Sequence, residues 1–326
     1  MGRYQCTVIN GVSSPLLPVV SGVPQGSVLG PILFSLFVND LPNYITLSHP
    51  LLPISLKLFA DDLKSYYVVD TLIDAIDFQS VINSIHTWCD IWQLSINVNK
   101  CSTLHLGSSN SHFVYGLNGI PLSSPGLVKD LGLLLDESLK FTPHISAIIS
   151  KARSRCGIFL KSFVSRDPQV MKRFFVVYVR PLLEYAGVVW NPISKTNIHS
   201  LEKVLRYFTN LIPTCRFLPY KRRLTILSLD SLELRRKILD LAYLYSLVTG
   251  SIDLTLSDYL IHIPPSITRG HNLKIKRPSV RYSATMCNFL SRTVPTWNTL
   301  PPSFFNSTSR SSFKKSLLKF LPDPCK

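Results

Sequence analysis

Two adjacent carboxylates, Asp61 and Asp62, are the residues of this sequence best suited to chemistry. They lie between two runs, 54–60 and 63–69, whose β-branched, aromatic and leucine residues are typical of hairpin strands. Two neighbouring negative charges repel unless a positive charge lies between them, and a divalent cation is the usual solution. For an isolated pair, an Asp-rich turn that faces solvent is the better interpretation. Other motifs in the chain are therefore needed to distinguish a metal-binding pair from a solvent-exposed turn.

A loop rich in glycine and proline, residues 21–31, precedes the carboxylates. Three glycines and two prolines constrain such a loop, yet they let a ligand approach its backbone closely. Pro31 is suited to the first position of a helix. Because residues 32–41 are apolar nearly all round, we expect that helix to be buried.

The remaining pattern of the first half predicts antiparallel strands with helices packed on them. Hairpins are predicted around Asn10-Gly11 and Asn118-Gly119, since these dipeptides supply the positive φ angles of a tight turn. Apolar residues at helical spacing predict a long helix over 72–94, which would cover one face of a sheet. A strand is predicted over 131–135. The fold class expected is α+β.

The second half is predicted to be mostly helical, and it carries the positive charge. Helices are expected over 142–163, 169–178, 195–211 and 231–248. Of the net charge of +16, residues 1–140 hold 6 Lys and Arg against 10 Asp and Glu, so the remainder has a net charge of +20. Because its basic residues lie among aromatic ones, nucleic acid is a better partner than lipid. A merely soluble basic surface stays open for any single cluster.

Several classes of protein are excluded by composition. The seven cysteines are scattered, without the spacing of a zinc module or a disulfide framework. The N-terminus lacks the layout of a signal peptide, and no apolar run reaches the roughly 18 residues that span a bilayer. We expect an intracellular protein of the cytoplasm or nucleus, without a membrane partner.

Four motifs in order resemble the reverse transcriptase of non-LTR (LINE-type, jockey-like) retrotransposons. They are the Gly22–Phe34 segment, Phe59-Ala60-Asp61-Asp62, Lys100 and Leu131-Gly132. Arg180–Ala186 and Trp297–Pro301 continue the resemblance, which covers essentially the whole chain as the C-terminal part of such a polymerase.

The resemblance implies roles for individual residues in an RNA-directed DNA polymerase with two Mg²⁺ ions, an RNA template, a DNA primer and dNTP substrates. Asp61, Asp62 and Lys100 would be catalytic, and the two aspartates would bind the metal. Lys100 would lie near the departing pyrophosphate, although a solvated loop lysine explains it equally well. Nucleotide and template would be bound by Gln25, Gly26, Phe59 and Ala60. The primer would be supported by Leu131 and Gly132.

The resemblance also implies another catalytic aspartate upstream of the glycine-rich loop, and residues 1–21 contain no Asp or Glu. We therefore expect a truncated or degenerate polymerase that is inactive alone, unless a further polypeptide supplies the missing palm. The predicted domains are a partial palm (1–140), a helical thumb and basic connection region (141–250), and a C-terminal region (251–326) with a loosely packed start and a small closing element. Two alternatives remain: a non-catalytic nucleic-acid-binding remnant, and a chain that does not fold stably.

Overall fold

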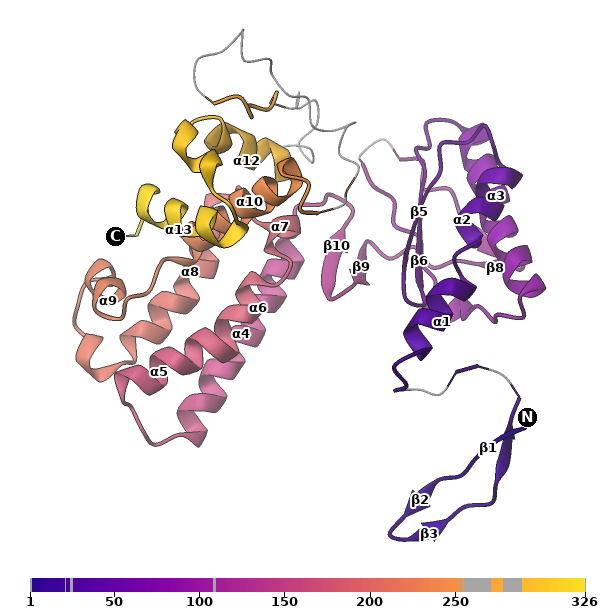
Figure 1. Ribbon diagram of the computed structural model, residues 1–326, viewed down its shortest axis with the longest axis horizontal. Helices are drawn as coiled ribbons and strands as arrows, with labels where there is room; N and C mark the ends of the chain where they lie inside the picture. The colour runs from indigo at the N-terminus through magenta and orange to yellow at the C-terminus, as the bar shows by residue number, and fades with distance from the viewer. Residues whose placement is uncertain are drawn as a thin grey trace. The chain divides into compact units, whose positions relative to one another are not determined.

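The computed structural model describes residues 2–20, 22–23, 26–107, 110–252, 254, 271–277 and 289–325 (Figure 1). The chain forms two compact units. The first unit comprises residues 1–103 and 109–124, and the second comprises residues 104–108 and 125–326. Strands and helices are mixed, so the predicted α+β class is confirmed. The predicted domain boundaries at 140 and 250 stay a prediction.

The strands of the first unit form antiparallel ribbons, each of two strands within the described residues. The strands are β1 (Arg3–Gln5), β2 (Val8–Ile9), β3 (Val12–Ser13), β4 (Leu17–Val19), β5 (Ser55–Phe59), β6 (Asp62–Tyr66), β7 (Gly116–Leu117) and β8 (Ile120–Pro121). The pairs are β1 with β4, β2 with β3, β5 with β6 and β7 with β8. The helices are α1 (Gly30–Phe37), α2 (Leu41–Ser48) and α3 (Leu72–Ile91).

Both predicted asparagine-glycine turns are confirmed. Asn10 and Gly11 join β2 to β3 with φ angles of 51° and 82°. Asn118 and Gly119 join β7 to β8 with φ angles of 50° and 75°. Two successive positive φ angles are what a two-residue hairpin loop of the primed type demands.

Helix α3 provides much of the core behind the β5–β6 hairpin. A capping box opens this helix: the Asp74 amide donates to Thr71 Oγ1 at 3.3 Å, and the Thr71 amide donates to Asp74 Oδ2 at 2.7 Å. The middle of α3 buries Val81 and Trp88, which belong to the apolar cluster that the half-buried Leu58 of β5 packs against. Helix α3 therefore has an apolar face that packs against the β5–β6 ribbon, as predicted. The buried residues of that face lie in the middle of the helix.

The prediction that the helix after the glycine-rich loop is buried is wrong. In α1, Ile32 is 55% exposed, Leu33 47% and Leu36 67%, whereas Phe34 packs against the core of the first unit. An apolar pattern all round a helix shows that the helix needs cover on every side, but it does not show which polypeptide provides that cover. The described residues of the first unit cover one side only.

In its described residues the second unit is a helical body with one strand pair, β9 (Leu127–Asp130) and β10 (Leu133–Asp136). Its α-helices are α4 (Thr142–Ser162), α5 (Pro168–Phe174), α6 (Arg180–Glu184), α7 (Gly187–Trp190), α8 (Lys195–Asn210), α9 (Tyr220–Ile226), α10 (Leu232–Val248), α12 (Phe289–Trp297) and α13 (Arg310–Phe320). A π-helical turn (Phe175–Val179) connects α5 to α6. The predicted helices over 142–163, 195–211 and 231–248 are confirmed within a few residues.

Two apolar cores meet at α10. One contains residues of α4, α6 and α8, and the other contains residues of α10, α12 and α13. Buried polar contacts connect the helices around them. Arg292 Nε donates to Asp240 Oδ2 at 2.9 Å, and Asn191 Nδ2 donates to the same oxygen at 2.7 Å. Arg235 of α10 also forms an ion pair with Glu184 of α6.

The end of the second unit folds back onto the start of α10. Asp323 Oδ2 accepts a hydrogen bond from the Ser231 amide at 3.0 Å, and Leu321 is buried at 9% exposure. The described part of the predicted closing element contains α12, α13 and this terminal segment, and its role as a separate element stays a prediction. Most of the predicted loose connector before residue 272 lies outside the described residues. A search of the described helices finds none with the length and hydropathy to span a membrane.

Candidate functional site

The two aspartates lie at the closed end of the β5–β6 hairpin. Phe59 and Asp62 form the last registered pair of the two strands, so only Ala60 and Asp61 remain in the turn. Ala60 has a φ of 52°, which lets the chain reverse within two residues. Asp61 is thus at the tip as predicted, whereas Asp62 is the first residue of β6.

The register places the site on the open face of this hairpin. Side chains alternate between the two faces of a strand, and opposite residues share a face. Leu58 and Leu63 are opposite each other and pack against the core of the first unit. Phe59 and Asp62 therefore lie on the other face, where both are exposed, and Asp61 at the tip is exposed too. A ligand can reach both carboxylates from solvent.

The donor set suits a metal ion that is shared with a substrate. Within the described ranges, no group of three or more His, Cys, Asp or Glu side chains could hold a metal by itself. Mg²⁺ in phosphoryl-transfer sites is bound by one or two carboxylates together with substrate phosphates and water, rather than by an all-protein cage. Asp61 and Asp62 fit that pattern.

The glycine-rich loop is described only in part, and Gln25 lies outside the described residues. Gly26 has a φ of 80°, and a Cβ built on it would meet no heavy atom within 4 Å. The backbone conformation alone thus explains why glycine is needed here. The loop passes into α1 through a local contact, in which the Gly30 amide donates to Ser27 Oγ at 3.1 Å.

Lys100 lies at the end of a short 3₁₀ turn, η1 (Val98–Lys100), on the surface of the first unit. Its amide donates to the Asn97 carbonyl at 3.0 Å, which fixes the backbone of the turn. Within the part of the chain that the structure describes, no ion pair joins Lys100 to Asp61 or Asp62. The lysine and the carboxylates are not brought into contact.

Leu131 and Gly132 belong to the second unit, where they form the turn between β9 and β10. The prediction that they lie within a strand is wrong, because their φ angles of 42° and 86° reverse the chain. Tyr185 packs on this turn: its hydroxyl donates to the Leu131 carbonyl at 3.0 Å, and its ring would lie 3.4 Å from a Cβ at position 132. Sequence reasoning noted Tyr185 only as part of a motif and missed this contact.

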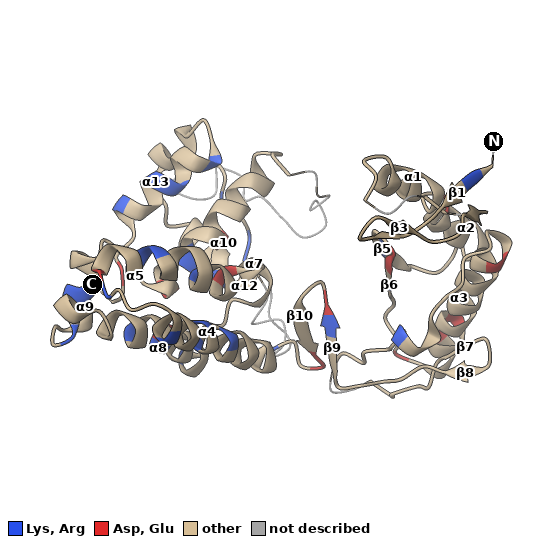
Figure 2. Cartoon of the chain, turned by 90° about the horizontal axis from the view of Figure 1, so that it is seen from below, with Lys and Arg blue, Asp and Glu red and all other residues tan. Residues whose placement is uncertain are grey.

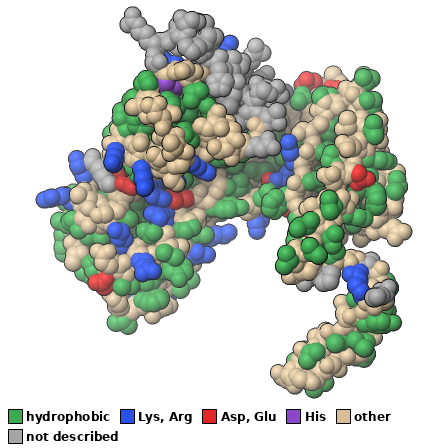
Figure 3. Space-filling model, viewed as in Figure 1, with side chains coloured by type: hydrophobic (Ala, Val, Ile, Leu, Met, Phe, Trp, Pro, Cys, Tyr) green, Lys and Arg blue, Asp and Glu red, His purple; other side chains and the backbone are tan. Residues whose placement is uncertain are grey.

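The surface of the second unit is strongly basic. Lys and Arg side chains lie on α4, α5, α8, α9 and α13, whereas the first unit carries few (Figure 2, Figure 3). An open hollow of about 410 Å³ is lined by Ser150, Lys151, Ser154 and Arg155 of α4 and by Leu182 of α6. Two cations and two hydroxyls without a carboxylate suit a phosphate group.

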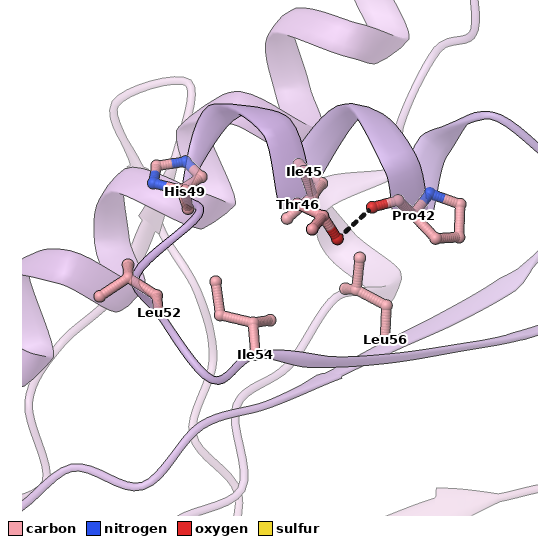
Figure 4. Close-up of a pocket in the computed structure, with 7 residues that line it drawn as sticks. All are labelled: Pro42, Ile45, Thr46, His49, Leu52, Ile54 and Leu56. Atoms are coloured by element: carbon pink, nitrogen blue, oxygen red, sulfur yellow. Dashed lines mark hydrogen bonds between the residues drawn. The ribbon is translucent and has the colours of Figure 1, made fainter.

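A smaller hollow of about 130 Å³ lies between α2 and the start of β5 (Figure 4). Its lining is mostly apolar, and its polar side chains are used within the unit. Thr46 Oγ1 donates to the Pro42 carbonyl at 2.9 Å, and His49 Nε2 lies 2.9 Å from Ser84 Oγ. Leu56 lines it from the core side of the hairpin, so the hollow is on the opposite face from Asp62.

Comparison with known proteins shows which family the first part of the chain matches. Residues 4–142 match the family described as "Reverse transcriptase (RNA-dependent DNA polymerase)". The chain is 30% identical over 238 residues to the "Probable RNA-directed DNA polymerase from transposon BS" of Drosophila melanogaster, covering 70% of this chain and 26% of that relative. It is 28% identical over 208 residues to the "RNA-directed DNA polymerase from mobile element jockey" of Drosophila funebris, covering 61% and 22%.

The chain thus spans about a quarter of the length of the curated relatives that it matches. The family match contains the exposed Asp61–Asp62 hairpin and the glycine-rich loop, and the longer alignments extend into the helical unit. Residues 4–142 therefore belong to the reverse transcriptase family, and over most of its length the chain is similar to the polymerases of jockey-like, non-LTR mobile elements.

Proposed function

We propose that the Asp61–Asp62 hairpin holds Mg²⁺ for nucleotidyl transfer in an RNA-directed DNA polymerase. The observation that carries this proposal is the position of both carboxylates at the end of a tight hairpin, exposed to solvent, within the residues that match the family. Phosphoryl transfer needs little covalent help from a protein, because positioning and positive charge supply most of the catalysis. Metal bound here would supply that charge at the reacting phosphate.

The chain's own residues would position the reactants around the metal. Asp61 and Asp62 would bind the metal through their carboxylate oxygens, and the two-residue turn fixes the backbone positions of these residues. The exposed ring of Phe59 and the compact turn residue Ala60 leave the open face accessible to the nucleotide and the template. Lys100 would neutralise charge on the departing pyrophosphate after the unit has bound its substrates.

The remaining assignments rest on resemblance. Gln25 and Gly26 would shape the floor under the incoming nucleotide. Leu131 and Gly132 would support the primer end through the β9–β10 turn, which Tyr185 braces. RNA template, DNA primer and dNTP are the ligands that these roles require.

We propose that residues 1–326 do not supply all the metal-binding carboxylates of the polymerase. Residues 1–21 carry no Asp or Glu, so the third carboxylate that the family resemblance implies is not supplied there. Two carboxylates leave much of the charge of two Mg²⁺ ions uncompensated. We therefore expect this stretch alone to incorporate nucleotides poorly, and to do so well when a further polypeptide adds the missing part of the palm.

A cleavage experiment tests the metal site without requiring a complete enzyme. Fe²⁺ replaces Mg²⁺ on the chain bound to an RNA–DNA hybrid with a dideoxy-terminated primer and the next dNTP, and peroxide then cuts the backbone near the bound iron. Cleavage is expected at about residues 58–63, suppressed by excess Mg²⁺ and lost in Asp61→Asn. Cleavage that is unchanged in Asp61→Asn and Asp62→Asn would contradict the proposal.

A second function, nucleic-acid binding without catalysis, is favoured by the net charge of +20 on residues 141–326. The hollow lined by Lys151 and Arg155 is where a backbone phosphate would bind. Such binding weakens steeply as salt rises, because bound cations are released from the nucleic acid. Salt-sensitive binding of hybrid without Fe²⁺ cleavage at the hairpin would favour this function over the first.

A further inference from the structure

The open face of the β5–β6 hairpin carries two directly opposed lysines. The register pairs Lys57 with Lys64, one step along the open face from the pair formed by Phe59 and Asp62. Opposite residues in an antiparallel pair have their Cβ atoms about 4.5–5.5 Å apart. Lys57 is exposed and Lys64 is half-buried, and both side chains start from neighbouring positions on this face.

This pairing is unexpected in a unit with few cations. Residues 1–124 contain four Lys and Arg residues, namely Arg3, Lys57, Lys64 and Lys100, against seven Asp. Two of the four lie opposite each other, although like charges in that position destabilise a hairpin. A purely structural role would be served better by one lysine and one acidic or neutral residue. The arrangement therefore indicates an anion that the two lysines share.

Distance along the strand suggests which anion. Lys64 lies two residues from Asp62 on the same face, a separation of roughly 6.6–6.8 Å at the rise of an antiparallel strand. A phosphate group held by metal at Asp62 would thus be followed, one short step along the hairpin, by a site for a second phosphate. Negative charges recur along one nucleic-acid strand about every 3.4 Å of helix axis, so neighbouring groups of the same strand lie within that reach.

Exposed aromatic rings flank the lysines on the same face. Phe59 is 64% exposed and Tyr66 is 49% exposed, and their positions alternate with Lys57 and Lys64 across the ribbon. Rings beside cations are typical of surfaces that bind a nucleic-acid strand, since phosphates meet the cations while bases or sugars pack on the rings.

We propose that Lys57 and Lys64 together bind one backbone phosphate of the nucleic-acid strand whose end is placed at Asp61 and Asp62. The inference rests on the proposed function, since it takes the reacting strand to lie over this hairpin. It adds a phosphate site on β5–β6 whose two ligands come from opposite strands of the ribbon.

Binding of the full chain to an RNA–DNA hybrid, without dNTP, tests this site. The affinity is measured by fluorescence anisotropy at several salt concentrations for wild type, Lys57→Gln/Lys64→Gln and Lys57→Arg/Lys64→Arg. Loss of a phosphate contact lowers the magnitude of the log–log salt slope by about 1. We expect this reduction, with weaker binding, in the glutamine variant and near wild-type values in the arginine variant.

A matched variant controls for net charge. Asn83→Glu/Thr87→Glu changes the charge of the first unit by the same two units on an exposed side of α3. This variant should alter the salt slope much less than the glutamine pair does. Thermal melts of all variants establish that they fold.

The outcomes separate this inference from the proposed function. A glutamine variant with wild-type affinity and slope would overturn the lysine site, even if Fe²⁺ cleavage shows metal at Asp61. The same variant with unchanged hybrid binding but a weaker affinity for dNTP would assign the phosphate to the nucleotide and contradict the inference. Equal losses in the glutamine pair and in the charge-matched control would also overturn it, because the effect would then be general electrostatics.

Discussion

Phe59 and Asp62 lie directly opposite each other at the closed end of the β5–β6 hairpin, which confines the turn to Ala60 and Asp61. Because the turn has only two residues, the position of Asp61 depends on the left-handed backbone conformation of Ala60. A looser loop between the strands would let the two carboxylates move apart, whereas a two-residue turn holds them at fixed strand positions.

The turn should be sensitive to a β-branched residue at position 60. Ala60 has a φ of 52°, in the left-handed region that branched side chains adopt at a cost of about 1–3 kcal/mol. Ala60→Val is expected to lower the free energy of unfolding of the first unit and the hairpin cleavage by Fe²⁺ together. Ala60→Gly should retain both. Equal urea midpoints for the valine and glycine variants would contradict this account of the turn.

The buried ion pair between Arg292 and Asp240 should contribute strongly to the free energy of unfolding of the second unit. Their side chains are 8% and 5% exposed, and the Arg292 guanidinium counteracts the burial that raises the pKa of Asp240. Arg292→Leu would leave a buried carboxylate without its ion-pair partner, a loss of about 3–5 kcal/mol. Urea unfolding measures this loss of unfolding free energy, and Arg310→Leu, at an exposed arginine, is the control. Similar midpoints for the two variants would contradict the prediction.

The terminal segment should stabilise the start of α10. Asp323 accepts a hydrogen bond from the Ser231 amide, and its negative charge lies at the positive end of the helix dipole. Asp323→Ala is expected to cost about 1–2 kcal/mol, as other losses of a helix cap do. Asp323→Asn keeps an acceptor oxygen and should lose less. The order of the urea midpoints, wild type above Asn above Ala, checks the prediction.

His144 should make the second unit less stable at low pH. Burial, with a smaller effect of Lys151, lowers the pKa of His144 below its usual 6.5, and its Nδ1 accepts from the Leu134 amide at 3.3 Å. Below pH 6.5 the unfolded chain therefore binds a proton that the folded chain resists, so stability falls as pH drops from 6.5 toward the lowered pKa.

A difference measurement isolates this histidine from other titrating groups. The pKa values of buried Glu202 and Asp240 are raised by burial, so they act in the opposite direction at acid pH. The difference in unfolding free energy between wild type and His144→Asn should be constant above about pH 7.5 and should shrink as the pH is lowered below 6.5. A difference that is constant with pH would contradict the prediction.

Much of the local structure was predictable because it depends on short-range chemistry. Asn10-Gly11 and Asn118-Gly119 predict hairpins through the φ angles that they allow, and the β-branched, aromatic and leucine residues on either side of Asp61 and Asp62 predict strands. Burial was less predictable. The apolar residues of α1 are exposed because burial depends on what lies against a helix, which periodicity does not record.

The candidate site was predicted by residue type, but its details needed three dimensions. Leu131 and Gly132 were expected at the start of a strand over 131–135, and the reversal at their positive φ angles was not predicted. The opposition of Lys57 and Lys64 depends on strand register, which the two-residue turn sets. In the sequence, six residues separate these lysines, and nothing in that spacing gave a reason to pair them.

The central claim, that Asp61 and Asp62 form a metal site for nucleotidyl transfer, is tested most directly by primer extension. The polypeptide is a chimera in which the residues of the Drosophila funebris jockey polymerase that precede its aligned region are joined to this chain. We predict Mg²⁺-dependent incorporation on an RNA template, reduced at least about 100-fold by Asp61→Asn, as for other groups that stabilise transition-state charge. Equal incorporation by the Asp61→Asn chimera, or none by a wild-type chimera that melts cooperatively, would contradict the claim.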